Sequence, residues 1–430
     1  MVVDADPKKI KKRLEQVVDQ AKLRIDLDSA QNPALRRAIE IVETFLKKSG
    51  RVCYGGQAIN AQLEQKDQFY DPNRALPDYD FFTPDAEKDT EGLIELLKES
   101  GYTEISKRIG IHDGTIKIYV NYVAIADISQ MIPEFYDTIY KKSRVVNGIH
   151  YADPLFLRML MFLELSRPRG QVERWDKVYE RLILLDKAHP LEKCKSQAPK
   201  IYESREAEKA RPSIIRYMIG KNRVYMGADI ATLYKQNSIQ TRKNFLLKGS
   251  SPVVFLSPDA IMDANKLSDD IGSIKKEILG YQNILPAMIV LTVNEEVVAI
   301  LVQEEACHSI VTIPVTKGRH LRMASLDTML TFLIGLYYRN DSLLMTQHSL
   351  LCWIRKFIDL SDRYKSRPTK LFPAFPIECS GYETSFASLL RAKAARIQAA
   401  RQGLSSGRSF TKSMRKKFSN KGSRRTRRHV

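Results

Sequence analysis

The stretch "VCYGGQAINAQL", residues 52–63, joins a short β-branched and aromatic run to two glycines and then to apolar residues at helical spacing. This order predicts a strand, a glycine turn and a short helix near 57–65. Gly55 and Gly56 allow the backbone to approach a ligand closely, and the helix that follows directs its N-terminal N–H groups and dipole to the same place. The stretch therefore predicts a triphosphate site at the turn.

Two aspartates in "LPDYDFF", residues 76–82, lie one residue apart in a predicted strand, so Asp78 and Asp80 share a face. Two carboxylates so placed repel each other unless a cation lies between them, and Mg²⁺ binds oxygen ligands together with substrate phosphates. Asp127 lies in the apolar strand "VAIADIS", where an acid is costly unless it is paired or binds metal. The three acids predict a site for two Mg²⁺ or Mn²⁺ ions. In such a site one ion activates an attacking hydroxyl and the other stabilises leaving pyrophosphate.

The chain repeats this pattern in its second half. "GRVCYGGQAI" at 50–59 is similar to "NRVYMGADIA" at 222–231, and three further pairs of segments follow in the same order at offsets of 172 to 175 residues. The repeat predicts an ancient duplication, with one α/β unit near 50–166 and a second near 222–338.

The second copy lacks the acids of the first. The predicted counterparts of the three aspartates are Pro252, Val254 and about Val302. This loss is expected if the acids serve chemistry in the first unit, while the copy only packs or binds.

Length and charge bound the class of protein. The chain has 430 residues, 43% of them hydrophobic, and a net charge of +19. This predicts two or three domains. Residues 391–430 hold 14 of the 69 Lys and Arg and no Asp or Glu, which leaves +5 for residues 1–390. We expect this segment to be a largely disordered cationic tail suited to a polyanion such as RNA, or a solubilising tail.

The cysteines and the apolar runs exclude other classes. Five cysteines lie far apart without a CxxC pair, which favours a reducing compartment with no zinc ribbon and no disulfide framework. No apolar run reaches the roughly 18 residues of a membrane span, and the N-terminus is polar. We therefore expect no membrane partner and no secretory signal.

Taken together, these motifs resemble the nucleotidyltransferase superfamily of DNA polymerase β type. The stretches "YGGQAIN", "LPDYDFF", "VAIADIS" and "ADPLFLRMLMFLELSRPRGQVERWDKVYERL" resemble the poly(A) polymerase catalytic subunits of poxviruses and giant DNA viruses, with good coverage over roughly 50–190. The resemblance implies a polynucleotide adenylyltransferase with ATP as substrate, an RNA 3′-hydroxyl as acceptor and pyrophosphate as product. It also implies a homodimer, and a location in the viral factory of the host cytoplasm or in the virion.

The resemblance assigns site residues. It makes Asp78, Asp80 and Asp127 the catalytic and metal-binding triad, and Gly55 and Gly56 the triphosphate turn. The superfamily often has Gly-Ser at this turn, and Gly56 has no hydroxyl, so Gln57 or Asn60 is expected to substitute. The basic stretch "SRPRGQVERWDKVYER" offers Arg174 and Lys177 to ATP or RNA, or else forms the solvated face of an amphipathic helix.

The predicted fold class is α+β: a nucleotidyltransferase-type mixed sheet with helices, duplicated as a catalytic and a degenerate unit, with helical connections and a disordered basic tail. The predicted parts are N-terminal helices 1–49, a catalytic domain 50–190, a helical connection 191–221, a degenerate domain 222–390 and the tail 391–430. Short motifs do not encode base choice, so CCA addition and uridylyl transfer are alternative reactions. A non-catalytic RNA-binding scaffold is the non-enzyme alternative.

Overall fold

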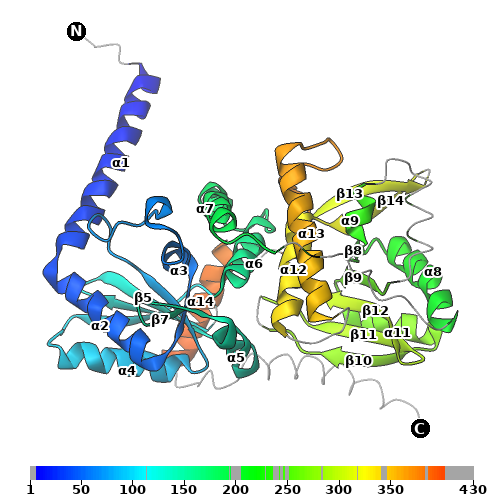
Figure 1. Cartoon of the computed structure of the whole chain (residues 1–430), viewed down its shortest axis with the longest axis horizontal. Coiled ribbons are helices and arrows are strands. Elements are labelled where there is room, and N and C mark those ends of the chain that lie inside the picture. The colour runs from blue at the N-terminus through cyan, green and yellow to red at the C-terminus, as the bar shows by residue number, and fades with distance from the viewer. Residues whose placement is uncertain are drawn as a thin grey trace. The chain divides into compact units, whose positions relative to one another are not determined.

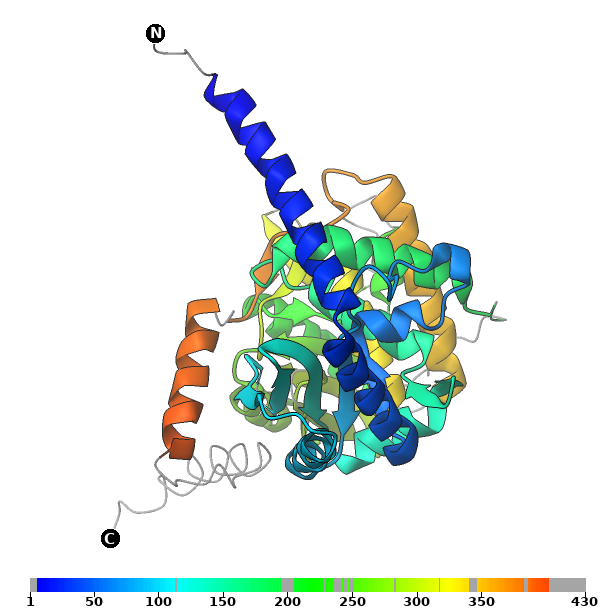
Figure 2. The same ribbon diagram turned by 90° about the vertical axis from the view of Figure 1, so that its left-hand side faces the viewer.

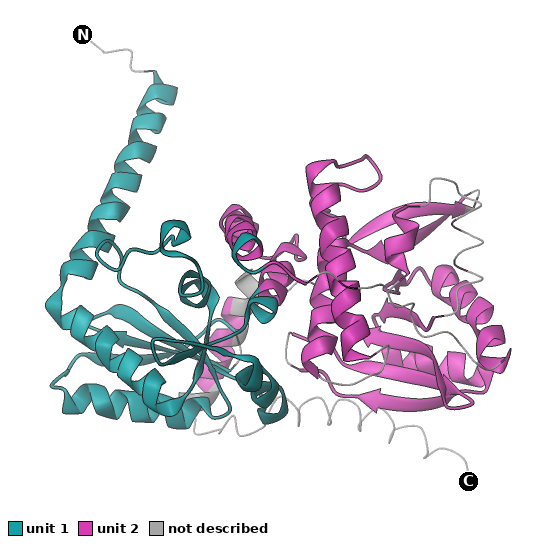
Figure 3. Cartoon of the chain, viewed as in Figure 1, with its two compact units in different colours: residues 1–157, 187–189 teal, residues 158–186, 190–430 magenta. Residues whose placement is uncertain are grey.

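The computed structural model describes residues 6–401 (Figure 1) except 113, 193, 195–204, 228, 236–241, 243–245, 247–250, 282–283, 317, 340–345 and 383–385. The predicted tail therefore lies mostly outside the described residues. The chain forms two compact units, Met1–Leu157 with Lys187–His189 and Arg158–Asp186 with Pro190–Val430 (Figure 3). The domain boundaries given above stay a prediction.

Two helices precede the first sheet. Asn32 separates α1 (Pro7–Gln31) from α2 (Pro33–Ser49), because its side chain accepts hydrogen bonds from the first backbone N–H groups of α2. Gly50, at φ +62°, ends α2 in the left-handed conformation that glycine adopts without strain. The α2 helix buries one apolar face, whereas α1 buries only Ala30 and extends away from the rest of the first unit (Figure 2).

The first unit is built on a seven-stranded mixed sheet in the order β3-β4-β5-β2-β1-β7-β6. Only the β2–β5 and β1–β7 pairs are parallel. The strands are β1 Val52–Tyr54, β2 Tyr79–Thr83, β3 Ile105–Ile109, β4 Thr115–Val120, β5 Val123–Gln130, β6 Arg144–Val146 and β7 Ile149–Tyr151. The helices that follow them are α3 Gly55–Asn60, η1 Gln65–Asp67, α4 Ala86–Glu99, α5 Pro133–Lys142 and α6 Pro154–Leu165.

The second unit has an eight-stranded sheet in the order β10-β11-β12-β9-β8-β14-β13-β15. Its strands are β8 Val224–Tyr225, β9 Val253–Ser257, β10 Ile274–Ile278, β11 Met288–Val293, β12 Glu296–Gln303, β13 His308–Thr316, β14 Arg319–Ala324 and β15 Cys379–Ser380. The remaining helices are η2 Val172–Arg174, α7 Trp175–Ala188, α8 Arg205–Gly220, α9 Ile230–Leu233, α11 Ala260–Ile271, α12 Leu326–Arg339, α13 Gln347–Ser366 and α14 Phe386–Arg401.

The predicted duplication is confirmed, because the first seven strands of the second sheet repeat the order of the first. Matching side-chain networks support it. Asp89 of α4 accepts from Arg51 (2.6 Å) and Thr83, as Asp263 of α11 accepts from Arg223 (2.7 Å) and Ser257 (2.6 Å). In each copy the network joins the residue before the first strand, the end of the second strand and the helix that follows it. Both copies are therefore held together by the same local contacts.

One predicted counterpart is wrong. Gln130 at the end of β5 caps α4, and Gln303 at the end of β12 caps α11 in the same way. The two strands therefore align at an offset of 173, and the strand register gives Ile300, not Val302, as the counterpart of Asp127. The error arose because residues 297–302 of β12 are all apolar, so the sequence comparison alone does not fix their register.

The expectation that the cysteines do not pair is also wrong. Disulfides join Cys194 to Cys352 and Cys307 to Cys379, across 158 and 72 residues, and Cys53 is buried and unpaired. Linear spacing failed here because folding of the second unit brings distant segments together. Within the described part of the chain, no helix has the length and apolarity that crossing a membrane requires.

Candidate functional site

A row of polar side chains crosses the centre of the first sheet. The backbone register pairs Tyr54 of β1 with Asp80 of β2, Asp80 with Asp127 of β5, and Asp127 with Lys117 of β4. Residues directly opposite on neighbouring strands project to the same face, so these four side chains line one face of the sheet. Asp78 precedes Asp80 by two residues and points to that face as well. The structure thus brings the three predicted acids together.

The glycine turn closes one side of this row. Gly55 follows β1 directly, begins α3 and has φ +74°. A Cβ at this position would overlap the Asp80 carboxylate and lie 3.1 Å from its Cγ. Glycine is therefore required twice, for its backbone angle and for the close approach to Asp80. Gly56 follows in the first turn of α3, so the turn lies beside the acids as the sequence predicts.

The acids of the row are only partly neutralised by protein groups. Asp127 is buried, with 8% of the residue exposed, and its Oδ2 accepts from the Lys117 ammonium. Its Oδ1 is buried and has no hydrogen-bond partner among the described residues. Burying a carboxylate oxygen without a hydrogen-bond donor costs free energy, and a bound cation at this atom would offset that cost. Three converging carboxylates are the donors that hard divalent cations prefer.

The electrostatics of the row agree with this geometry. Desolvation and the charge of Asp127 raise the pKa of Asp78, against a lowering by Lys117. Burial lowers the pKa of Lys117, but the hydrogen bond and charge of Asp127 outweigh it and raise the pKa above its ordinary value. Burial and Asp80 also raise the pKa of Tyr54, which stays a neutral phenol, 2.8 Å from Ser129 Oγ. The cluster thus holds excess negative charge that a cation relieves.

The predicted phosphate ligands have different surroundings. Asn60 is buried, and its Oδ1 accepts from the N–H groups of Phe69 and Tyr70 at 2.8 and 2.9 Å, which holds the loop after α3. Gln57 has a buried Oε1 without a hydrogen-bond partner among the described residues. The Asn60 side-chain oxygen therefore has a structural role, whereas the Gln57 oxygen makes no hydrogen bond to the described residues.

The two predicted basic ligands belong to the second unit. Arg174 lies 3.2 Å from Glu164 in an ion pair and bonds to Gln171. Burial, followed by the charges of Arg181 and Arg174, lowers the pKa of Lys177. These side chains form a cationic cluster near the start of α7, which is suited to an anion. Their role toward ATP or RNA stays a prediction.

The equivalent row in the second unit is apolar. Its members, taken from the same register, are Met226, Val254, Ile300 and Val290, each at most 2% exposed. Met226 N donates to Val254 O at 2.6 Å, so the backbone arrangement of the row is kept. A sheet of this topology therefore forms without the acids and the lysine. Their presence in the first unit is explained by chemistry and not by folding.

Sequence reasoning missed Tyr54, Ser129 and Lys117 as members of the site. A lysine in the apolar strand "TIKIYV" was the available signal. A two-residue turn at 121–122 would pair Lys117 with Ala126, however. A register shift between Ile118 and Tyr119 moves the partner to Asp127, and this bulge was not visible in the sequence.

A comparison with protein families indicates which class of protein has this fold and this site. Residues 40–171, which include the glycine turn and all three acids, match the model of the family described as "Poly(A) polymerase catalytic subunit". The resemblance predicted from the sequence is thereby confirmed over this segment.

Particular relatives come from large DNA viruses. The chain is 29% identical over 188 residues to a candidate poly(A) polymerase catalytic subunit of Acanthamoeba polyphaga mimivirus, covering 43% of this chain and 32% of that one. It is 30% identical over 162 residues to a candidate subunit of African swine fever virus (Tick/Malawi isolate), covering 36% and 34%. The chain thus spans about a third of the length of these curated relatives.

A solved structure extends the similarity to both units. The crystal structure of the Megavirus polyadenylate synthase matches 93% of this chain and 84% of its own, with a TM-score of 0.74 and 19% identity. This likeness confirms the predicted α+β fold with its duplicated mixed sheets.

Proposed function

We propose that the protein is a polynucleotide adenylyltransferase that adds AMP from ATP to RNA 3′ ends without a template. The observation that carries this proposal is the row of three carboxylates against Gly55. It lies inside the segment that matches the poly(A) polymerase family model. Adenylyl transfer needs positioning and charge neutralisation more than covalent chemistry by the protein, and this row offers both.

In the proposed mechanism, Asp78, Asp80 and Asp127 hold two divalent ions, Mg²⁺ or Mn²⁺. When bound, such ions supply Lewis-acid charge to the attacking hydroxyl and to the leaving pyrophosphate. Gly55 keeps side-chain bulk away from the Asp80 carboxylate and leaves room for the triphosphate. The strand register places the Asp127 backbone, and the Lys117 ammonium holds its side chain through Oδ2 before substrate binds, which lowers the cost of reaching the reactive geometry.

The second unit has another part in this proposal. Its apolar row leaves it without acids at the equivalent position, so we assign it a role in packing and in framing RNA. The 14 cationic residues of 391–430 add affinity for RNA phosphates. By the same resemblance we propose a homodimer that acts in the viral factory of the host cytoplasm or is packaged in the virion.

The test is extension of a short labelled RNA by the purified protein with each NTP separately and with Mg²⁺ or Mn²⁺. Long tails with ATP alone support the proposal. Equal extension with UTP favours uridylyl transfer, and addition limited to CCA favours tRNA repair. No extension with either metal contradicts catalysis and leaves an RNA-binding scaffold.

Lys117 gives a second prediction that does not depend on turnover. Lys117→Met leaves Asp127 without its partner, and because the lysine is about one-third exposed we expect a loss of only about 1 kcal/mol in the unfolding free energy. A divalent ion replaces the missing charge, so Mg²⁺ should raise Tm by about 2–4 °C more in the variant than in the wild type. Thermal unfolding with and without Mg²⁺ measures this difference.

The matched control is Lys107→Met on β3 of the same sheet, which breaks the exposed 2.7 Å ion pair between Lys107 and Glu87 of α4. It should leave the Mg²⁺ effect unchanged. An equal Mg²⁺ shift in Lys117→Met and the wild type would show that no cation binds beside Asp127.

A further inference from the structure

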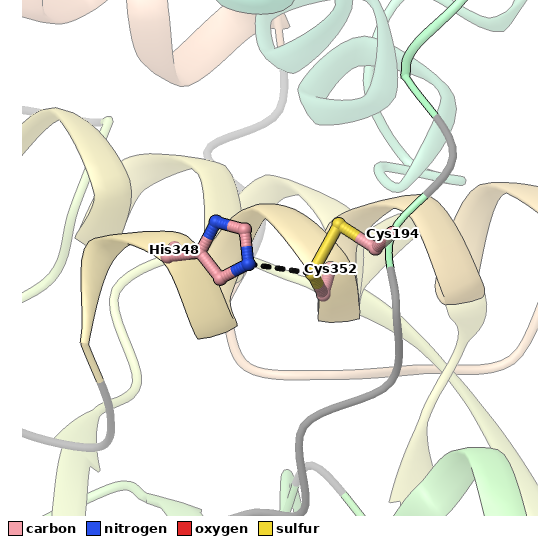
Figure 4. Close-up of side chains that lie close together, drawn as sticks. All are labelled: Cys194, His348 and Cys352. Atoms are coloured by element: carbon pink, nitrogen blue, oxygen red, sulfur yellow. Dashed lines mark hydrogen bonds between the residues drawn. A yellow bond between two sulfur atoms is a disulfide. The ribbon is translucent and has the colours of Figure 1, made fainter.

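The second unit holds a cluster of metal-binding side chains that the proposed reaction does not use. Figure 4 shows Cys194, His348 and Cys352, whose ligand atoms all lie within 4.8 Å of one another. His348 and Cys352 are one turn apart on α13 and so share a face, while Cys194 lies on the segment after α7. His348 Nε2 is 3.8 Å from Cys352 Sγ. Three soft or borderline ligands therefore converge from two segments.

This convergence does not rest on the disulfide alone. Arg355, one turn beyond Cys352, donates from Nη1 to the Leu191 carbonyl at 2.6 Å, which ties the segment before Cys194 to α13. Arg355 is itself fixed by a 3.0 Å pair with Asp359. Thr346 caps the start of α13 by accepting from Ser349 N at 3.2 Å, close to His348. Both sides of the cluster thus have their own contacts when the sulfur atoms are not bonded to each other.

We propose that Cys194, His348 and Cys352 bind one Zn²⁺ ion when the disulfide is reduced. A thiol or phosphine reductant converts the disulfide to two thiols, and each thiol releases a proton to solvent as its sulfur binds the metal. Zn–S and Zn–N bonds of about 2.3 and 2.0 Å give a tetrahedral edge of about 3.5 Å, close to the observed 3.8 Å between Nε2 and Sγ. The exposed His348 leaves the fourth position open to water.

The donor set separates this site from the carboxylate row. Two thiolates and an imidazole favour zinc and similar ions, whereas Mg²⁺ prefers oxygen. Oxidation of the two thiols by a peroxide forms the disulfide and water, removes both thiolates and so excludes the ion. The cluster therefore cross-links α13 to the segment at Cys194 in both redox states, through zinc when the cysteines are reduced and through the disulfide when they are oxidised.

The test uses the full chain, reduced with a phosphine, freed of metal and titrated anaerobically with Co²⁺ in excess Mg²⁺. We expect one equivalent of Co²⁺ with a thiolate-to-metal charge-transfer band, which Zn²⁺ then removes by displacement. Oxygen ligands such as the aspartates give no such band. Cys194→Ser and Cys352→Ser should abolish it, and His348→Gln should weaken Co²⁺ binding at least about tenfold.

The matched control is the double variant Cys307→Ser/Cys379→Ser, which removes the other disulfide and should keep the band. As a second readout, Zn²⁺ should raise the Tm of the reduced wild type and the control, but not that of Cys194→Ser. Absence of the band in the reduced wild type, or a band that persists in Cys194→Ser and Cys352→Ser, overturns the proposal. The pair then acts as a disulfide only.

Discussion

Asp80→Asn and Asp127→Asn are each expected to reduce AMP incorporation by at least about a thousandfold, equivalent to roughly 4 kcal/mol of transition-state stabilisation. Asn has nearly the shape of Asp and keeps a carbonyl oxygen, but it lacks the charge that holds a divalent ion. Both positions lie in the centre of the sheet, on β2 and β5. Initial rates of ATP-dependent RNA extension measure the loss.

The fold should survive both changes. The second unit forms the same strand register with Val254 and Ile300 at these positions, so a charge is not needed for the sheet. Tm within a few degrees of wild type would separate lost chemistry from lost structure. Asp270→Asn, at an exposed position of α11, is the control and should keep full activity. Either variant retaining more than a tenth of wild-type activity contradicts the assignment of these acids.

Gly55→Ala is the second change with a large expected effect. The new Cβ overlaps the Asp80 carboxylate, and φ +74° costs about 1–2 kcal/mol for a residue other than glycine. Asp80 must move to relieve the overlap, and a displacement of about 1 Å in a catalytic group can cost about a hundredfold in rate. We therefore expect activity to fall at least a hundredfold, with a modest decrease in Tm.

Gly101→Ala is a matched control for this variant. Gly101 also has positive φ, +92°, but a Cβ there meets no atom within 4 Å. It should show a similar backbone cost without loss of activity. If Gly55→Ala is as active as Gly101→Ala, the glycine is required only for its backbone angle and not for the approach to Asp80.

The first half of the fold was largely predictable because its signals are local. The Gly55 turn and the alternation around Asp80 each depend on residues only a few positions apart. The strands β3, β6 and β7 and the helix α5 were not predicted, and with three residues each β6 and β7 are too short to show a period in the sequence. Gln130 and Gln303 make equivalent hydrogen bonds to the helices α4 and α11. These contacts align the two copies more accurately than the sequence comparison does.

The carboxylate site was only partly predictable. The spacing of Asp78 and Asp80 fixes a shared face, and an acid in the apolar β5 strand indicates a partner. The partner itself, Lys117, depends on a bulge between Ile118 and Tyr119, which tertiary packing decides. The pairing of Cys194 with Cys352 likewise depends on how α13 packs, and no spacing along the chain encodes it.

The central claim is that the three acids hold two divalent ions beside the glycine turn. The most direct test is to count Mn²⁺ bound in the presence of a non-hydrolysable ATP analogue, by equilibrium dialysis and paramagnetic resonance, on protein with the Cys194–Cys352 disulfide intact. The account predicts two ions per chain in the wild type and neither in the Asp80→Asn/Asp127→Asn double variant. The same number of bound ions in both proteins would contradict it.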